Sequence, residues 1–312
     1  MNNNFKVNGR DLSINEYKII SNFFFEISKN TKINRQLIFR GDSFENLKTK
    51  LNINEYDNFY NKLDYFIFNL GDKGRVYQEE YRKTIKKENI FPIDCTDKII
   101  FEHIFIKFNK IFKSSKNSEI IEFKALNKDF ASYFLKKTNN QHFIELILSE
   151  PKNNQIKIRD YYLCILHKVG KFGFYNNSFF VSTTTDNKIA ATFSKSIIFV
   201  GWYYYSINIE LKNILSKKLL PVTKTILYSY QKEISIKGGI LPHYLLGYIK
   251  KETNEFILNP NLFKYKIPIL NLIKFGIPLN QDNFDEILSE TNYTGYFTID
   301  TENNYDDKNI SR

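Results

Sequence analysis

Residues 179–193 read FFVSTTTDNKIAATF, and this stretch indicates how the chain folds. Its first three residues are apolar, and a short apolar run of this kind is typical of a buried strand. Four hydroxyl residues, from Ser182 to Thr185, follow the run, and Asp186 can then cap a short helix that continues through Phe193. We therefore expect a strand that ends in hydroxyl side chains and turns directly into a helix.

The sequence on the two sides of this stretch differs in periodicity. Before it, apolar residues recur at helical spacing, and the first such pattern opens with Ser13 and Glu16 in the form of a capping box. One short apolar run there, 36–40, predicts a strand instead. After Gly173 the runs are short and rich in Ile, Tyr and Val, as in strands. The predicted helices are 13–27, 54–70, 77–87, 97–112, 128–137, 141–150 and 159–168, and the further predicted strands are 197–211, 233–237, 243–250 and 255–258.

The composition describes a folded chain with a basic surface. The chain has 312 residues, of which 42% are hydrophobic, so it can bury a sizeable core. Its net charge of +11 attracts polyanions such as nucleic acid, although a solvated lysine-rich face has the same composition. The N-terminus has no signal-peptide pattern, and the longest apolar stretch, 197–207, is too short to span a bilayer. We expect a cytoplasmic protein without a membrane partner, and a polar tail after Thr291 that frays.

The cysteines and histidines do not predict a metal site. The two cysteines, Cys95 and Cys164, are too few and too far apart for a disulfide framework or a zinc site. Both lie in apolar surroundings, so we expect buried free thiols. The histidines show no metal-ligand spacing and are expected to be structural or surface residues; they are His103, His142, His167 and His243.

Three short signals carry the candidate chemistry. Arg40 ends an apolar run and precedes Gly41, Ser182 opens the run of hydroxyl residues, and Glu233 opens an apolar strand pattern two residues after Gln231. Strand alternation predicts that Gln231 and Glu233 share a face, where an inward-facing carboxylate needs a partner or a function. Taken singly, each signal also fits a structural role: a strand-end arginine, a capped turn or a polar edge strand.

In this order along one chain, the three signals resemble the arginine–serine–glutamate class of mono-ADP-ribosyltransferases, which includes many bacterial toxins. The first motif also resembles the FRG domain, named for Phe-Arg-Gly. The resemblance covers motif positions between Phe39 and Glu233 and does not extend to the intervening sequence. It implies an α+β fold, with an ADP-ribosyltransferase-like split β-sheet core and a large helical insertion in the first half. Residues 1–312 would form a single domain, with 43–170 as the inserted helical lobe and 173–260 as the sheet-rich catalytic core.

The resemblance also implies roles for individual positions, with NAD⁺ as co-substrate and no metal. Arg40 would bind the NAD⁺ phosphates with its guanidinium fork, and the backbone of Gly41 would meet the nicotinamide amide. Ser182 would orient the catalytic glutamate, and Glu233 would stabilise the oxocarbenium-like ribose. The implied catalytic residues are Glu233, Gln231 and Ser182, and the implied NAD⁺-binding residues are Arg40, Gly41, Ser182, Thr183 and Phe193.

Arg159 is a rival for the arginine role. Arg40 lies 142 positions before Ser182, which is farther than in compact toxins of this class, whereas Arg159 lies much closer. We prefer Arg40 because it ends a predicted strand and precedes glycine, whereas Arg159 lies at the start of a predicted helix.

The implied acceptor is a nucleobase. In this class the residue two before the catalytic glutamate helps to choose the acceptor, and glutamine there goes with asparagine side chains or bases. Here that residue is Gln231, and Tyr228 and Tyr230 precede it, where aromatic rings can stack on an unpaired base or simply pack. Together with the basic charge, this favours nucleic acid, as single-stranded RNA or DNA and not duplex, and we expect RNA ahead of DNA. The alternatives are a toxin that modifies an asparagine side chain and a catalytically inactive nucleic-acid-binding module.

The biological role follows by analogy alone. RNA-modifying toxins of phage defence are the nearest analogy, and such an enzyme would harm its own cell. We therefore expect a toxin or defence effector, with an antitoxin protein as a candidate partner.

Overall fold

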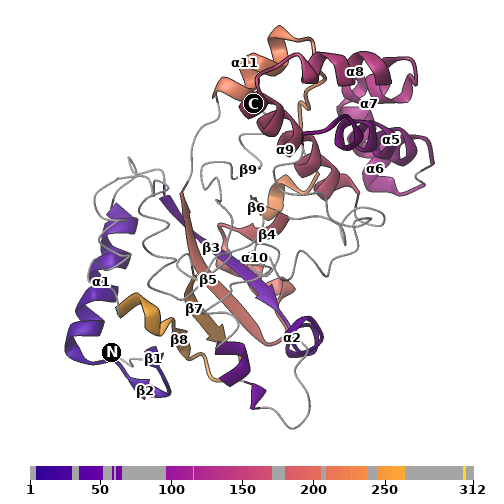
Figure 1. Cartoon of the computed structure of the whole chain (residues 1–312). Helices are drawn as coiled ribbons and strands as arrows, with labels where there is room; N and C mark the ends of the chain where they lie inside the picture. Colours follow the sequence, from indigo (N-terminus) through magenta and orange to yellow (C-terminus); the bar gives the residue numbers. More distant parts are fainter. Residues whose placement is uncertain are drawn as a thin grey trace. The chain divides into compact units, whose positions relative to one another are not determined.

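A computed structural model describes residues 5–29, 35–51, 58–59, 61–64, 96–114, 116–170, 180–204, 209–225, 227–237, 245–263 and 305–306. The chain divides into two compact units, and each is built from separate segments (Figure 1). The first unit comprises Met1–Thr84, Val181–Ser206 and Gly238–Asn304, and the second comprises Ile85–Phe180, Ile207–Lys237 and Tyr305–Arg312. The prediction of a mixed α+β fold is confirmed.

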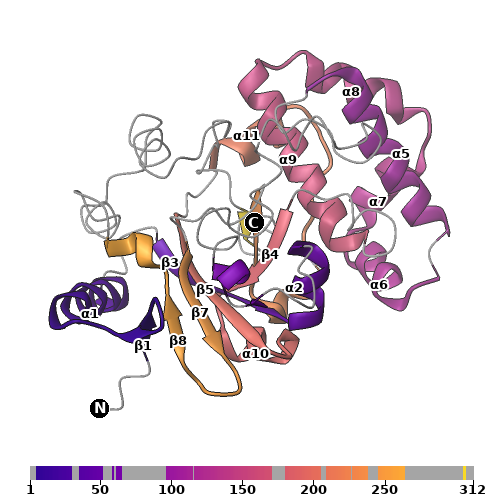
Figure 2. The ribbon, with the colours of Figure 1, turned by 60° about the horizontal axis from the view of Figure 1, so that its bottom comes forward.

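A mixed β-sheet forms the first unit. Its strands run in the order β2-β1-β8-β7-β5-β3-β4, and all neighbours are antiparallel except β1 and β8, which are parallel (Figure 2). The longest pairing joins β3 to β5, from Arg35 opposite Tyr204 to Asp42 opposite Ile197. The strands are β1 (Phe5–Val7), β2 (Arg10–Asp11), β3 (Arg35–Asp42), β4 (Phe180–Thr184), β5 (Ile197–Tyr204), β7 (Leu245–Lys250) and β8 (Phe256–Leu258).

Strand β5 lies near the middle of this sheet and is buried on both faces. Ile197, Phe199, Val200 and Trp202 are all almost fully buried, which explains the continuous apolar run in the sequence. The predicted strand 197–211 is nevertheless too long, because helix α11 (Ile209–Lys217) begins within it. Leu211, the last residue of the predicted strand, and Leu215 are both buried and lie four positions apart, which is the spacing of one face of a helix.

The helices of the first unit include the predicted N-terminal helix. The capping box is confirmed, because the Ser13 N–H donates to Glu16 Oε2 over 2.8 Å and the Glu16 N–H donates to Ser13 Oγ over 3.3 Å. Helix α2 was not predicted. None of the helices in the described segments is both long and apolar enough to cross a membrane. The helices are α1 (Ile14–Lys29), α2 (Phe44–Leu51) and α10 (Asn187–Phe193), with the 3₁₀ turn η5 at Pro260–Phe263.

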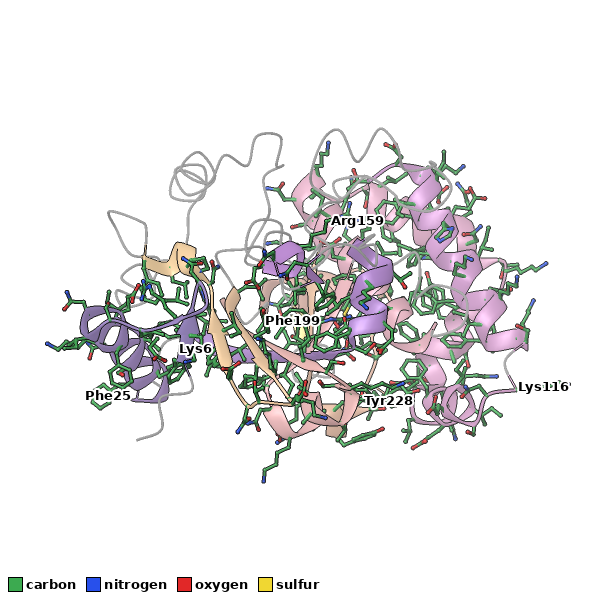
Figure 3. All side chains as sticks on the ribbon, turned by 90° about the horizontal axis from the view of Figure 1, so that it is seen from below. Lys6, Phe25, Lys116, Arg159, Phe199 and Tyr228 are labelled. Carbon is green, nitrogen blue, oxygen red and sulfur yellow. The ribbon has the colours of Figure 1, made fainter. Side chains whose placement is uncertain are left out.

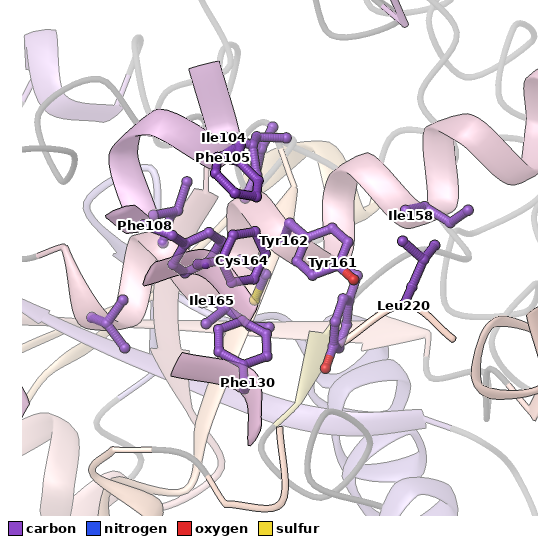
Figure 4. Close-up of a cluster of buried hydrophobic side chains, with 14 of the residues drawn as sticks. Ile104, Phe105, Phe108, Phe130, Ile158, Tyr161, Tyr162, Cys164, Ile165 and Leu220 are labelled. Carbon is purple, nitrogen blue, oxygen red and sulfur yellow. The ribbon is translucent and has the colours of Figure 1, made fainter. Parts of the chain in front are cut away.

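The second unit is a helical bundle around a phenylalanine-rich core (Figure 4). The rings of Phe108 and Phe134 are 4.5 Å apart, and that of Tyr162 packs edge-on against Phe143 at 5.1 Å. Helix α6 was not predicted; its N-terminus is capped by Asn117. The helices are α5 (Lys98–Ser114), α6 (Ser118–Leu126), α7 (Lys128–Leu135), α8 (Asn139–Leu148), α9 (Lys152–Val169) and α11.

Helix α9 runs through the middle of this bundle. It begins at Lys152, well before the predicted start, and it ends as predicted at Gly170, whose N–H donates to the Leu166 carbonyl over 2.7 Å. Every residue from Ile158 to Val169 is buried, so charged side chains on this helix lie inside the protein. Arg159 is one of them (Figure 3).

The loop after α11 is tied to the bundle by hydrogen bonds. The Asn127 side chain accepts the backbone N–H groups of Lys224 and Thr225 over 2.7 and 3.1 Å and donates to the Thr225 carbonyl over 3.1 Å. The Tyr161 hydroxyl accepts the Thr223 N–H over 3.0 Å. The segment that leads toward Glu233 is therefore fixed to α9 and to the junction of α6 and α7, where Asn127 lies.

Strand β6 (Glu233–Lys237) forms as predicted and pairs antiparallel with β9 (Tyr305–Asp306). The prediction that the whole tail frays is wrong at these two residues, because their backbone extends a sheet. The predicted helical lobe, 43–170, and the predicted catalytic core, 173–260, do not coincide with the two units. Residues 207–237 of the predicted core belong to the helical second unit. The single ADP-ribosyltransferase-like domain stays a prediction.

Several other predictions concern residues at the margins of the described segments. Cys164 is a buried free thiol, as expected. In the predicted helix 54–70, residues 61–64 are helical and Leu63 is buried. The predicted helix 77–87, and the residues Cys95 and His243, lie outside the described residues.

Candidate functional site

Arg40 and Ser182 come together in the first unit, although 142 positions separate them in the sequence. Arg40 Nη1 donates to the main-chain carbonyl oxygen of Ser182 over 2.7 Å. The pairing of β3 with β4 brings them together, with Phe39 opposite Thr184. Arg40 Nη2 also lies 3.9 Å from Oδ2 of Asp42, and its side chain retains 13% exposure. The first two predicted motifs thus occupy neighbouring strands, and the Arg40 side chain is partly exposed.

Gly41 is required by the packing of helix α10 on strand β3. A Cβ atom at this position would lie 2.2 Å from the carbonyl oxygen of Ala190 and 2.6 Å from the backbone nitrogen of Ser194. Both atoms belong to backbone, so they cannot move aside as a flexible side chain would. The missing side chain therefore admits α10, whereas its predicted role toward the nicotinamide stays a prediction.

We expect Gly41→Ala to lower the free energy of unfolding by about 1–3 kcal/mol, as overpacking of a tight site does. The added methyl group would force α10 away from β3. Thermal unfolding followed by circular dichroism measures the effect, with the exposed α10 residue Thr192→Ala as the control. An unchanged unfolding temperature for Gly41→Ala would contradict this account of the packing.

The hydroxyl residues of β4 lead into α10 as the sequence predicts. Ser182 is half-buried, whereas Thr183 and Thr184 are buried. Thr184 Oγ1 accepts the Asp186 N–H over 3.1 Å, and the Asp186 carboxylate caps α10 by accepting the Lys188 N–H over 3.0 Å. The three hydroxyl residues belong to the strand itself, because β4 continues through Thr184.

Phe193 is the last residue of α10, and its side chain is 59% exposed. A large aromatic side chain in this position contributes little to the core of the first unit. Its ring is accessible to a ligand, as the predicted contact with nicotinamide requires.

Glu233 lies in the second unit, at the start of β6, and is 9% exposed. Ser235 Oγ donates a hydrogen bond to Glu233 Oε1 over 2.8 Å, and Nε2 of His167 on α9 lies 3.7 Å from the same oxygen. The second distance is too long for a hydrogen bond but within ion-pair range when the imidazole is protonated. Glu233 is therefore a buried carboxylate with polar neighbours from two elements, as such a group requires.

His167 and Ser235 were not predicted as site residues. His167, like the other histidines, was expected to be a structural or surface residue. Its contact with Glu233 joins two positions far apart in the chain, so no local pattern indicates it. Ser235 had a local signal, since strand alternation from Glu233 places it on the same face.

Gln231 does not share a strand face with Glu233, and this prediction is wrong. Residues Ser229–Gln231 form a 3₁₀ turn, η3, and Lys232 has a positive φ of 48°, so regular strand geometry begins only at Glu233. Gln231 Nε2 lies 3.3 Å from the hydroxyl of Tyr230 and can donate to it. The strand spacing that motivated the role of Gln231 in acceptor recognition is therefore absent.

The two predicted stacking tyrosines differ in their environments. Tyr230 is 72% exposed, so its ring is accessible to an acceptor. Tyr228 packs partly against the core of the helical bundle, and its hydroxyl donates to the Glu119 carboxylate. Burial, followed by this hydrogen bond, raises the pKa of Tyr228. A packing role thus accounts for Tyr228, whereas Tyr230 lies edge-on to the ring of Tyr228, with centroids 6.3 Å apart, and stays largely exposed.

The rival arginine is part of an internal ion pair. Arg159 is 1% exposed, and its Nε and Nη2 atoms donate to Asp160 Oδ1 over 2.8 and 2.6 Å. The sequence predicted that Arg159 lies at the start of a helix, and this is wrong, because α9 begins at Lys152 and Arg159 lies in its interior. An arginine committed to a buried carboxylate is a poor candidate for a phosphate ligand, so the preference for Arg40 stands.

The candidate site residues thus fall into two groups. The first unit contains Arg40, Gly41, Ser182, Thr183 and Phe193, and the second contains Tyr228, Tyr230, Gln231 and Glu233.

Within the described segments, no group of three or more His, Cys, Asp or Glu side chains gathers as metal ligands would. Comparisons of the chain with models of known protein families, with curated proteins and with solved structures found no match.

Proposed function

We propose that the protein is a mono-ADP-ribosyltransferase that uses NAD⁺. The observation that carries the proposal is the hydrogen bond between Arg40 and Ser182, in which an arginine of β3 donates to the backbone of the hydroxyl-rich neighbouring strand β4. The order of the motifs along the sequence singles out Arg40 and Ser182, and the pairing of β3 with β4 makes them neighbours. Glu233, a buried carboxylate at the start of another strand, supplies the third element of the class.

The proposed reaction breaks the glycosidic bond between nicotinamide and the ribose C1′ of NAD⁺. Nicotinamide leaves with the bonding electron pair, and positive charge develops on the ribose. Glu233 would stabilise that charge, and Arg40 would hold the phosphates of NAD⁺. A lone pair of the acceptor then forms the new bond to C1′, and the acceptor's proton passes to solvent. Ser182, Thr183, Gly41 and Phe193 would complete the NAD⁺ site.

The distribution of charge supports a nucleic acid as the acceptor. The second unit contains 24 Lys and Arg against 14 Asp and Glu, whereas the first contains 21 against 20. Almost the whole net charge of +11 therefore belongs to the helical unit, which also carries Glu233 and the exposed Tyr230. A basic surface binds the phosphate backbone, and an exposed ring can stack on an unpaired base. We propose single-stranded RNA ahead of DNA, in a toxin or defence effector with an antitoxin partner.

The experiment that tests the proposal uses NAD⁺ labelled on its adenylate half. The purified chain is incubated with labelled NAD⁺ and with separate RNA, DNA and protein fractions, and covalent label is counted in each. Label in RNA supports the full proposal, and label in protein alone replaces the acceptor with an asparagine side chain. Without label in any fraction and without release of nicotinamide, the transferase proposal is wrong.

Binding of single-stranded RNA is expected to depend steeply on salt. Raising the salt concentration from about 50 to about 200 mM should weaken binding at least about 10-fold if several phosphates are contacted. The double variant Lys110→Glu, Lys113→Glu on the exposed side of α5 should weaken binding further, because it reverses charge on the basic unit. The matched control in the first unit is Lys18→Glu with Lys48→Glu, on α1 and α2.

Fluorescence anisotropy with a labelled oligonucleotide measures each affinity. Binding that is insensitive to salt, or equal losses in the two double variants, would contradict the assignment of RNA binding to the helical unit.

A further inference from the structure

The carboxylate of Glu233 is approached by two polar groups from two different elements. Ser235 lies two residues farther along β6, so both side chains leave the strand on one face, and its hydroxyl donates to Oε1 over 2.8 Å. The imidazole of His167 comes from α9, and its Nε2 lies 3.7 Å from that same oxygen. One oxygen of the carboxylate is thus located by the strand that carries it and by the helix beside it.

We infer that Ser235 and His167 are positioning residues that hold Glu233 for the reaction, an inference that rests on the proposed transferase function. A glutamate side chain has several rotatable bonds, and a carboxylate stabilises a developing charge best when its position is fixed beforehand. The hydroxyl donates to a charged acceptor, which makes this hydrogen bond a strong one. Both groups act on substrate only through Glu233.

Both positioning groups are themselves held in place. Ser235 is completely buried, and its backbone pairs with β9 at Tyr305. His167 is 3% exposed, and its ring lies against that of Phe180, with centroids 5.9 Å apart. On the opposite face of β6, Ile234 and Ile236 are buried. A side chain whose supports are fixed by packing keeps its geometry through the catalytic cycle.

The first test compares Ser235→Ala with Ser235→Thr in the full chain. The alanine variant loses the donor to Glu233, whereas the threonine variant keeps a hydroxyl group on the same strand face. We expect kcat for nicotinamide release to fall by about 10-fold or more in Ser235→Ala, with KM for NAD⁺ changed by no more than about 3-fold. Ser235→Thr should keep kcat within about 3-fold of the wild-type value.

The second test compares His167→Phe with His167→Gln. Phenylalanine keeps a ring against Phe180 but presents no polar atom to Glu233, whereas glutamine can place its amide nitrogen near the position of Nε2. We expect His167→Phe to lower kcat at nearly constant KM, and His167→Gln to restore part of the loss. The exposed α8 residue His142→Gln serves as the control and should match the wild-type chain.

The outcomes separate the inference from the function on which it rests. Wild-type kcat in both Ser235→Ala and His167→Phe overturns the positioning role and leaves the transferase proposal intact. Equal losses within each pair, accompanied by lower unfolding temperatures, assign the two residues to stability and also overturn it. If Ser235→Thr fails to fold, the His167 pair decides. A wild-type chain that neither binds NAD⁺ nor releases nicotinamide overturns the function and the inference together.

Discussion

The Glu233→Gln variant is expected to release nicotinamide from NAD⁺ at least about 100-fold more slowly than the wild-type chain. The substitution keeps the volume of the side chain, and the amide oxygen can still accept the hydrogen bond from Ser235. It removes the negative charge that would oppose the positive charge on the ribose in the transition state. The loss should therefore fall on kcat and leave the binding of NAD⁺ nearly unchanged.

Two measurements make this result interpretable. Thermal unfolding of Glu233→Gln should agree with that of the wild-type chain to within a few degrees, because the buried volume is kept. Glu145→Gln, on the exposed surface of α8, changes a carboxylate in the same unit and should retain full activity. Near-normal transfer by Glu233→Gln would remove Glu233 from the proposed role.

Arg40→Ala is expected to weaken the binding of NAD⁺ by about 10- to 100-fold. Hydrogen bonds to a charged group contribute about 1.5–3 kcal/mol, and the guanidinium would supply them to the phosphates. Arg40→Lys should recover only part of the loss, since an ammonium group lacks the planar fork. Calorimetric titration with NAD⁺ measures both dissociation constants, and nicotinamide release at saturating NAD⁺ separates binding from chemistry.

The comparison with Arg159 makes the assignment falsifiable. Arg159→Ala leaves the buried Asp160 without this ion pair, so it should destabilise the fold by about 3–5 kcal/mol. The folded fraction should still bind NAD⁺ with wild-type affinity. The opposite ranking, with NAD⁺ binding lost in Arg159→Ala and kept in Arg40→Ala, would show that the wrong arginine was chosen.

Local patterns predicted the local structure of the site well. The capping box at Ser13 and the cap at Asp186 form as expected, because each depends on residues within one helical turn. The run from Glu233 to Lys237 is a strand, as its alternation of polar and apolar residues predicted. These features are determined by short segments, and a sequence displays them directly.

Contacts between distant segments were less accessible from sequence. The prediction that Gln231 shares a strand face with Glu233 was wrong because the positive φ of Lys232 interrupts the strand. Lysine is not a residue type that indicates a positive φ, so the sequence did not predict the interruption. The strand predicted over 197–211 was too long because an apolar run suits a strand or a helix until packing decides. The approach of His167 to Glu233 depends on how α9 lies beside β6, which no local pattern encodes.

The interleaving of the two units along the chain has a consequence for handling the protein. The backbone passes from one unit to the other at 84–85, 180–181, 206–207, 237–238 and 304–305. No single truncation can isolate either unit, because segments of the two units alternate along the chain. A fragment that starts or stops at 180–181, 206–207 or 237–238 lacks segments of both units. Many of the contacts must form between segments far apart in sequence, which slows folding and favours aggregation of incomplete chains. Loss of solubility on shortening the chain would therefore report broken topology, and only substitutions within the intact chain can divide the functions of the two units.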